Sequence, residues 1–231
     1  MKKPHSLRMT CVSVFFLFAA AAISPAQTFT TLVNYNGANG AEPRSALIQA
    51  TDGNFYGTTE GQVEVSGGTV FRITPSGTLT ALYTFCSQPH CADGEYPEGG
   101  LVQAIDGDFY GTTSQGGSNA LGTIFKITMG GVLSTLHSFD NTDGNGPFGA
   151  LVLGSDGDFY GTTQSGGNAG DGTVFKITPS GTLTTLHNFD GSDGYSPWAW
   201  CRVQMGIFMG QPMAAGPTTT EQFSKSPPGA C

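Results

Sequence analysis

The chain has 231 residues, of which only 11% are charged and 35 are glycine, and its formal net charge is −8. Residues 27–198 hold 4 basic and 16 acidic side chains, a net charge of −12. So acidic a segment does not suit nucleic acid or anionic membrane as a partner. No useful stretch outside the N-terminal segment has the period of an amphipathic helix, which argues against a helical fold.

The first 26 residues have the features of a secretory signal peptide. Their basic start, apolar run and small-residue cleavage site lie at residues 2–8, 11–23 and 24–26. The apolar run is too short to span a bilayer comfortably. We therefore expect a bacterial protein that is secreted, extracellular or held at the cell surface, with no membrane insertion after signal cleavage.

A unit of about fifty residues then occurs three times. The letters FYGTT stand at Phe55–Thr59, Phe109–Thr113 and Phe159–Thr163. Thirteen residues after the first letter of each begins a second motif, GTVFRIT, GTIFKIT or GTVFKIT. Every unit has four strand-like runs, which in the third unit are 150–156, 158–164, 172–178 and 182–189.

Four antiparallel strands at this period are typical of a β-propeller blade. We therefore predict an all-β fold of four-stranded antiparallel blades, with three blades in frame and an incomplete ring. A parallel β-helix or other solenoid is the alternative, although its coils are shorter than this period. The pairs Asp52-Gly53, Asp106-Gly107 and Asp156-Gly157 predict tight type I′ turns between the first and second strands.

The repeat also sets the expected domain boundaries. Residues 27–36 match the fourth strand of a unit, which predicts an N-terminal strand that latches the ring. The other segments are expected at 37–85 for blade 1, 86–139 for blade 2 with an inserted Cys loop, 140–189 for blade 3 and 190–198 for the start of a fourth blade. Three blades leave an open face at each end, which predicts poor solubility.

The tail, residues 199–231, lacks the pattern of the units before it. Back-translation into a shifted reading frame restores both motifs, again thirteen residues apart. We interpret the tail as a frameshifted, non-native sequence and the chain as a damaged reading of a longer repeat protein. No function is expected of the tail.

Cysteine use is informative in the second unit. Cys86 and Cys91 lie in an insertion that lengthens this unit by four residues. A small loop closed by its own disulfide fits an oxidising compartment. Two free thiols are the alternative, while Cys201 and Cys231 belong to the tail.

The letters DGDFYGTT, GTVFKITPSG and TLTTLHNF resemble the GloVer-type tandem repeat of secreted bacterial proteins. The resemblance covers nearly all of residues 28–198. It implies an extracellular repeat protein, in some members followed by a C-terminal surface-sorting segment. It implies no catalytic residues.

Recurring acidic residues are the first candidates for a site. The triplets at 52–54, 106–108 and 156–158 offer oxygen ligands for calcium. They lack the further carboxylates of a strong site, and turn chemistry explains them. Turns also explain the Asp-Gly pairs at 93–94, 143–144 and 193–194.

Recurring aromatic and imidazole side chains are the second group. His137 and His187 share a repeat position with Tyr83 and Val33, so we expect a packing or surface role there. The identical tyrosines, Tyr56, Tyr110 and Tyr160, are expected in the core. Sugar binding by a ring of these tyrosines is the alternative.

The repeats show no nucleophile elbow, phosphate loop or Cys/His metal spacing. We therefore expect no catalytic residues, no metal and no cofactor. The predicted function is a secreted, non-catalytic binding, adhesion or surface-display module with an extracellular glycan or protein as partner.

Two alternatives remain. One is a propeller enzyme acting on extracellular polysaccharide or lactone, which needs acidic or metal-binding residues that break the repeat symmetry near the axis. We expect none in the in-frame blades, so they would lie in missing blades. The other is a non-functional fragment of a decayed or mis-sequenced gene.

Overall fold

The computed structural model describes residues 29–36, 40–61 and 67–197. The predicted signal peptide and the predicted frameshifted tail lie outside these residues. The chain divides into two compact units, residues 1–31 and residues 32–231, and the second holds every described strand. In the described part of the chain no helix has the length and apolar character needed to cross a bilayer.

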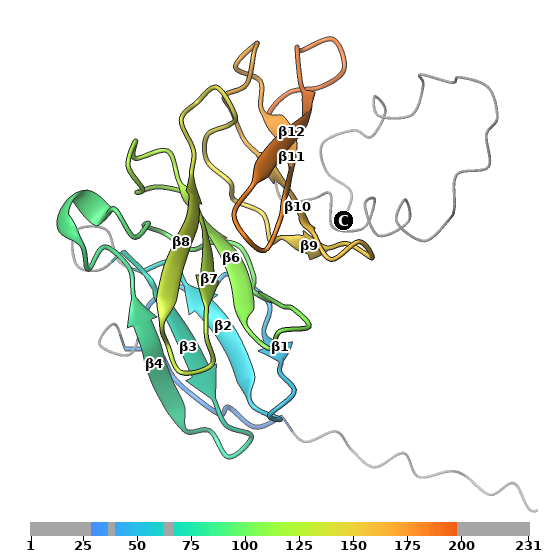
Figure 1. Cartoon of the computed structure of the whole chain (residues 1–231). Helices are drawn as coiled ribbons and strands as arrows, with labels where there is room; N and C mark the ends of the chain where they lie inside the picture. Colours follow the sequence, from blue (N-terminus) through green and yellow to red (C-terminus); the bar gives the residue numbers. More distant parts are fainter. Residues whose placement is uncertain (1–28, 37–39, 62–66, 198–231) are drawn as a thin grey trace, which may run out of the picture. The chain divides into compact units, whose positions relative to one another are not determined.

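The described strands form three separate four-stranded antiparallel sheets, each in the order of the chain (Figure 1). Blade 1 consists of β1 (Ile48–Gln49), β2 (Phe55–Thr59), β3 (Thr69–Ile73) and β4 (Leu79–Thr84). Blade 2 consists of β5 (Val102–Gln103), β6 (Phe109–Thr113), β7 (Thr123–Ile127) and β8 (Leu133–Ser138). Blade 3 consists of β9 (Val152–Leu153), β10 (Phe159–Thr163), β11 (Thr173–Ile177) and β12 (Leu183–Asn188). The prediction of four-stranded antiparallel blades is confirmed.

The two motifs of each repeat pair with one another inside a blade. In blade 2 the register places Gly111 opposite Phe125 and Thr113 opposite Thr123. The two Thr hydroxyl oxygens are 2.8 Å apart and buried. A Cβ atom on Gly111 would lie 2.6 Å from Cζ of Phe125, so the ring can cross the strand only over a glycine.

The turn between the first two strands differs from the expected type I′ turn. Asp52, Asp106 and Asp156 keep negative φ, whereas Gly53 has a φ of 80°. The amide of Gly53 donates to the carbonyl of Ala50, and the amide of Ala50 donates to the carbonyl of Asn54. This is a three-residue loop that ends in a left-handed glycine, a geometry that also matches the twist of the strands. The prediction overlooked that Asp accepts a bond from the amide two residues on, here Asn54, without positive φ.

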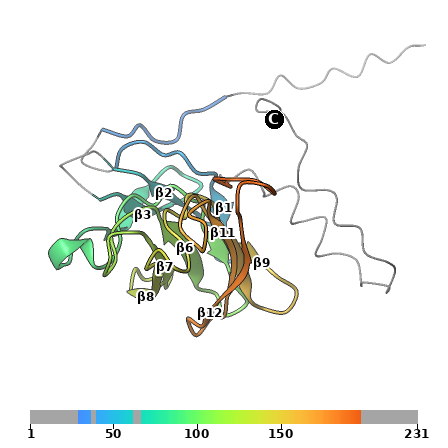
Figure 2. The same cartoon turned by 90° about the horizontal axis from the view of Figure 1, so that it is seen from above.

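The apolar core lies between the blades. One cluster joins blade 1 to blade 2 and a second joins blade 2 to blade 3, so blade 2 lies between the other two (Figure 2). The strand β7 serves both clusters, with Ile124 in the second and Phe125 and Ile127 in the first. The expected burial of both faces of the third strand is confirmed for this blade.

The N-terminal segment is not the strand that the sequence predicts. None of the described residues 29–36 belongs to a strand. Tyr35 nevertheless meets Phe71 edge-on, with ring centroids 5.6 Å apart, as Phe85 meets Phe125 and Phe139 meets Phe175. Tyr35 therefore packs like a residue of a fourth strand, but no third strand among the described residues pairs with the segment.

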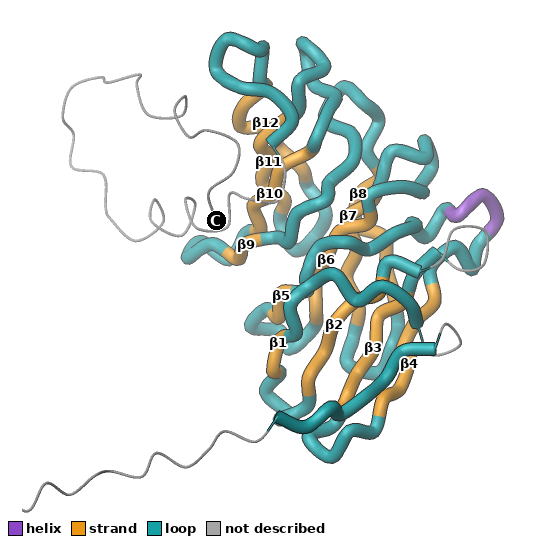
Figure 3. The backbone as a smooth tube through the Cα atoms, turned by 180° about the vertical axis from the view of Figure 1, so that it is seen from behind, coloured by secondary structure: helices purple, strands orange, loops and turns teal. Residues whose placement is uncertain are grey.

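Cys86 and Cys91 form a disulfide, in line with the sequence prediction. The loop between them contains the short 3-10 turn Pro89–Cys91, the purple segment in Figure 3. Its backbone is tight, since Cys86, His90 and Cys91 all have positive φ.

Candidate functional site

The recurring tyrosines lie within the packing between blades. Tyr56 and Tyr110 are fully buried, and their rings lie 4.3 and 4.1 Å from the rings of Phe109 and Phe159. Burial and the Asp52 carboxylate, which accepts a hydrogen bond from the hydroxyl of Tyr56, raise the pKa of Tyr56 to about 12. These contacts support core packing for both tyrosines and leave their ring faces no room for a sugar.

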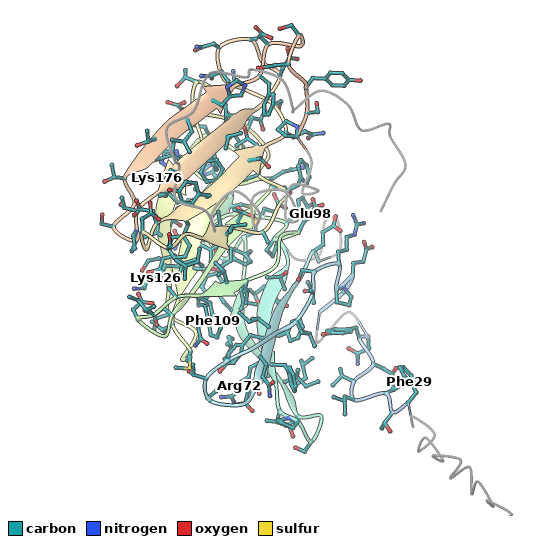
Figure 4. All side chains as sticks on the ribbon, turned by 90° about the vertical axis from the view of Figure 1, so that its right-hand side faces the viewer. Phe29, Arg72, Glu98, Phe109, Lys126 and Lys176 are labelled. Carbon is teal, nitrogen blue, oxygen red and sulfur yellow. A yellow bond between two sulfur atoms is a disulfide. The ribbon has the colours of Figure 1, made fainter. Side chains whose placement is uncertain are left out.

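The acidic triplets satisfy their oxygens within each blade. Asp106 accepts bonds from the amide of Asp108, the hydroxyl of Tyr110 and the ammonium group of Lys126 at 3.1, 2.9 and 2.9 Å. Partial burial opposes ionisation of Asp106, but the bonds from Lys126 and Tyr110 prevail and lower its pKa. Arg72, Lys126 and Lys176 occupy one repeat position, one on each blade (Figure 4). The structure therefore favours turn and anchor roles over calcium binding.

The second set of Asp residues does more than form turns. Asp143 Oδ2 lies 2.7 Å from His137 Nε2, and Asp193 Oδ2 lies 2.6 Å from His187 Nε2. In blade 1 the hydroxyl of Tyr83 donates to Asp93 over 2.8 Å. Each pair ties the fourth strand of a blade to the segment that leads onward, which agrees with a packing role for the histidines.

One group of three metal-type ligands occurs among the described residues: Cys86, Cys91 and Glu95. Because both sulfur atoms are in the disulfide, neither is a thiolate that could bind a metal. The group offers a single carboxylate and is a poor metal site.

A pocket of about 180 Å³ lies where the segments that enter the three blades meet. Its lining includes Arg44, Glu98 and Phe148, which stand at one repeat position directly after an invariant proline. The same position therefore carries a cation, an anion and an aromatic ring. The pocket therefore brings together three unlike side chains from equivalent positions of the three blades.

Hydrogen bonds from the FYGTT motif bring these positions together. The hydroxyl of Thr58 donates to the carbonyl of Gly99 at 3.1 Å, and that of Thr112 donates to the carbonyl of Gly149 at 2.9 Å. Each bond holds the entering segment of the next blade against the end of the FYGTT strand. The residues before Gly99 and Gly149 are Glu98 and Phe148.

The charges of the pocket are unequal. Arg44 lies 2.7 Å from Glu42, 2.5 Å from Glu60 and 4.0 Å from Glu98. Its contact with Oε2 of Glu60 is an ion pair without hydrogen-bonding geometry, so this buried oxygen lacks a hydrogen-bond donor. The hydroxyl of Ser114 donates to Glu98 over 3.0 Å. Three carboxylates around one guanidinium leave a net negative site.

Burial raises the pKa of Glu60, and the charge of Glu98 adds to this effect. Glu60 follows β2 directly, as Ser114 follows β6 and Gln164 follows β10, so this position also varies between blades. Glu60 and Glu98 are therefore acidic residues without acidic counterparts in the other described blades, which the sequence analysis overlooked. A comparison of the residues after each Pro and each FYGTT could have found them.

Proteins of known structure give distant matches. The chain is 20% identical to virginiamycin B lyase from Staphylococcus aureus, covering 64% of this chain and 42% of that one, with a TM-score of 0.44. It is 19% identical to a gluconolactonase from Xanthomonas campestris, covering 60% of this chain and 44% of that one, with a TM-score of 0.41. The chain thus spans less than half the length of either protein. No curated protein matches it.

A family model gives a broader match. The model described as the Gloeobacter/Verrucomicrobia repeat matches residues 19–222, which include all three blades. The repeat motifs, the antiparallel blades and this match agree, and the chain belongs to the Gloeobacter/Verrucomicrobia repeat family.

Proposed function

We propose that this protein is a non-catalytic extracellular binding module and that the pocket around Arg44, Glu98 and Phe148 is its recognition site. The observation that carries this proposal is that three unlike side chains from one repeat position, Arg44, Glu98 and Phe148, line one pocket. Constant positions satisfy packing and turns, whereas variable polar positions on loops held by a rigid scaffold commonly serve recognition.

The chemistry of the pocket suits an extracellular glycan. Carboxylate and guanidinium groups bind sugar hydroxyls through charge-assisted hydrogen bonds, which are the stronger kind. Phe148 supplies an apolar surface for a sugar ring, and the excess negative charge disfavours acidic sugars. A neutral or cationic glycan is the expected ligand. The alternative ligand is a protein with basic side chains at its surface.

A glycan array followed by titration calorimetry tests the proposal. We expect Glu98→Gln to weaken binding about tenfold, because a hydrogen bond to a charged group is worth about 1.5–3 kcal/mol. Asp108→Asn is the matched control, since it also removes one negative charge. Asp108 directly precedes β6, whereas Glu98 contacts Ser114, which directly follows it. Equal loss of binding in both variants, or no binding by the parent protein, would count against the pocket.

The location outside the cell is part of the same proposal and is supported by the N-terminal sequence and the disulfide. Expression of the full chain in a bacterial host, followed by mass spectrometry of the exported protein, tests it. We expect a mature N-terminus near Gln27. Retention of an uncleaved chain in the cytoplasm would contradict it.

An enzyme acting on polysaccharide or lactone is a second candidate, favoured by one observation. The raised pKa of Glu60 beside Glu98 is the property that a general acid requires. Turnover of a polysaccharide or lactone panel that is lost in Glu60→Gln would establish this activity and displace the first proposal.

The third candidate is a fragment without function, which rests on the frame change in the tail. Resequencing of the gene across codons 190–231 and beyond tests it directly. Missing bases would reveal the longer parent protein, whereas a confirmed frameshift with no binding or turnover would support a decaying gene.

A further inference from the structure

The two interfaces between blades follow one rule. Tyr56 of blade 1 stacks on Phe109 of blade 2 at 4.3 Å, and Phe85 meets Phe125 edge-on at 5.0 Å. The second interface repeats both pairs one unit later, as Tyr110–Phe159 at 4.1 Å and Phe139–Phe175 at 5.4 Å. Each blade thus has a forward face, with the tyrosine of FYGTT, and a rear face, with the phenylalanine of FYGTT.

The forward face of blade 3 carries the same side chains with less cover. It comprises Tyr160, Val174, Leu186 and Phe189, none of which is buried. At the two interfaces between blades, the residues equivalent to Tyr160 and Val174 are fully buried: Tyr56, Tyr110, Val70 and Ile124. Leu186 is 51% exposed. The described residues therefore leave this face without the blade that its chemistry fits.

The rear face of blade 1 shows the opposite half of the interface. Leu47 is 51% exposed, whereas its counterparts Leu101 and Leu151 are 6% and 4% exposed. Phe55 is partly exposed, whereas Phe109 and Phe159 are fully buried. This face has the phenylalanine and leucine that should meet a forward face.

We propose that the forward face of blade 3 docks on the rear face of blade 1 of a second copy of this chain. Tyr160 would stack on the partner's Phe55, as Tyr56 stacks on Phe109 and Tyr110 on Phe159. The two faces belong to one repeated interface, so the partner with the right side chains in the right order is another copy. Two chains supply six blades, which lies within the four to eight of closed propellers.

A head-to-tail contact of this kind must close or it continues into a filament. Closure as a dimer satisfies both faces of both chains at once. The N-terminal segment has to make room, because Tyr35 covers Phe71 where Phe189 of the second copy would lie. None of the described residues 29–36 belongs to a strand, and Leu32 is 48% exposed, so the segment can move without breaking a described strand ladder.

Sedimentation velocity of the full chain over a dilution series tests the proposal. We expect a dimer whose dissociation constant rises at least about tenfold in Leu47→Asp and in Leu186→Asp, since each buries a charge in an apolar interface. Both leucines are half exposed within a single chain, so both variants should keep the parent melting curve at dilutions where the parent is monomeric. Tyr35→Ser loosens the N-terminal segment and should strengthen the dimer.

Ile105→Asp is the matched control, because Ile105 is 99% exposed at a hairpin turn away from both faces. It should leave the dissociation constant unchanged. An equimolar mixture of the two leucine variants should form more dimer than either alone, because one intact interface remains. A monomer at every concentration, or association that Leu47→Asp leaves unchanged, would overturn the proposal.

Discussion

At the scale of single residues, the ring and the hydroxyl of the tyrosine in the FYGTT motif make different contacts. The ring of Tyr110 stacks on the next blade, while its hydroxyl donates to Asp106 in its own hairpin turn. Lys126 reaches the same carboxylate over 2.9 Å. A single side chain therefore couples the turn of one blade to the packing of the next.

We predict that Tyr110→Phe and Tyr110→Ala separate these roles. The first loses a hydrogen bond to a charged carboxylate and should lower the free energy of unfolding by about 1.5–3 kcal/mol. The second also loses the buried ring and should cost about 3–5 kcal/mol. Urea denaturation measures both, and Tyr160→Ala, on a partly exposed ring, should cost less than Tyr110→Ala.

Glu60 provides a second residue-scale prediction. Its pKa is raised in the folded chain above the ordinary value of 4.5, so the folded state holds the proton more tightly than the unfolded state. The contribution of Glu60 to stability is then full below pH 4.5 and is lost as the pH rises through the folded pKa. Glu60→Gln, which cannot ionise, should therefore be more stable than the parent at pH 7, with the difference shrinking toward pH 4.

Denaturation midpoints at both pH values measure this effect. Glu42→Gln is the control, because it removes another carboxylate from Arg44 at a side chain that is 53% exposed. A parent protein more stable than Glu60→Gln at pH 7 would show that the ion pair with Arg44 outweighs the burial of Glu60.

At the scale of elements, each hairpin is held by contacts of its own. The buried Thr hydroxyls, the glycine under the phenylalanine ring and the left-handed glycine of the turn all lie within one unit. The fourth strand is the exception, since its Tyr83, His137 or His187 bonds to an Asp six or ten residues on. The loop with the disulfide sits inside the longest of these connections.

We predict that Cys86→Ser with Cys91→Ser lowers the free energy of unfolding by about 2 kcal/mol, from the entropy of closing so short a loop. Asp93 should stay in place, because Tyr83 and the amide and hydroxyl of Ser87 all donate to it. Thermal melts with and without reductant give the comparison: reduced parent and double variant should melt alike. Loss of blade 2 structure on reduction would contradict the assignment of a local role.

At the scale of the whole molecule, stability depends on the neighbours of a blade. Blade 2 is covered by an apolar cluster on each face, whereas blades 1 and 3 each take part in one. Repeat proteins of this kind gain their stability from such shared interfaces. The two outer faces are also the reason to expect poor solubility of a single chain, a prediction that stands alongside the proposed dimer.

Hydrogen exchange should reveal this gradient. In dilute, monomeric solution we expect the slowest amides in β6 and β7 and faster exchange in β10 and β11, because blade 3 can open without breaking two interfaces. Exchange followed by mass spectrometry measures the order. Equal protection of β6 and β10 in the monomer would show that blade 3 has a cover beyond the described contacts.

Local sequence was sufficient for the blades themselves. The FYGTT and GT(V/I)F(K/R)IT motifs, with β-branched and aromatic residues between turn residues, determined the strands, their antiparallel order and the burial of both faces of the third strand. The predicted type of the hairpin turn was wrong because it ignored the hydrogen bond that the Asp side chain accepts from the amide two residues later. The latching strand predicted at residues 27–36 stays a prediction, since none of the described residues 29–36 belongs to a strand.

Only the tertiary structure decided the candidate site. Arg44, Glu98 and Phe148 are far apart in the sequence, and the proline before each of them does not show that they meet. They meet because Thr58 bonds to the entering segment of the next blade, a contact between residues 41 positions apart. Local patterns specify hairpins, since these bonds form between neighbours in the chain. Side chains from different units come together only when the apolar faces of successive blades are buried against each other, and this packing placed three unlike residues in one pocket.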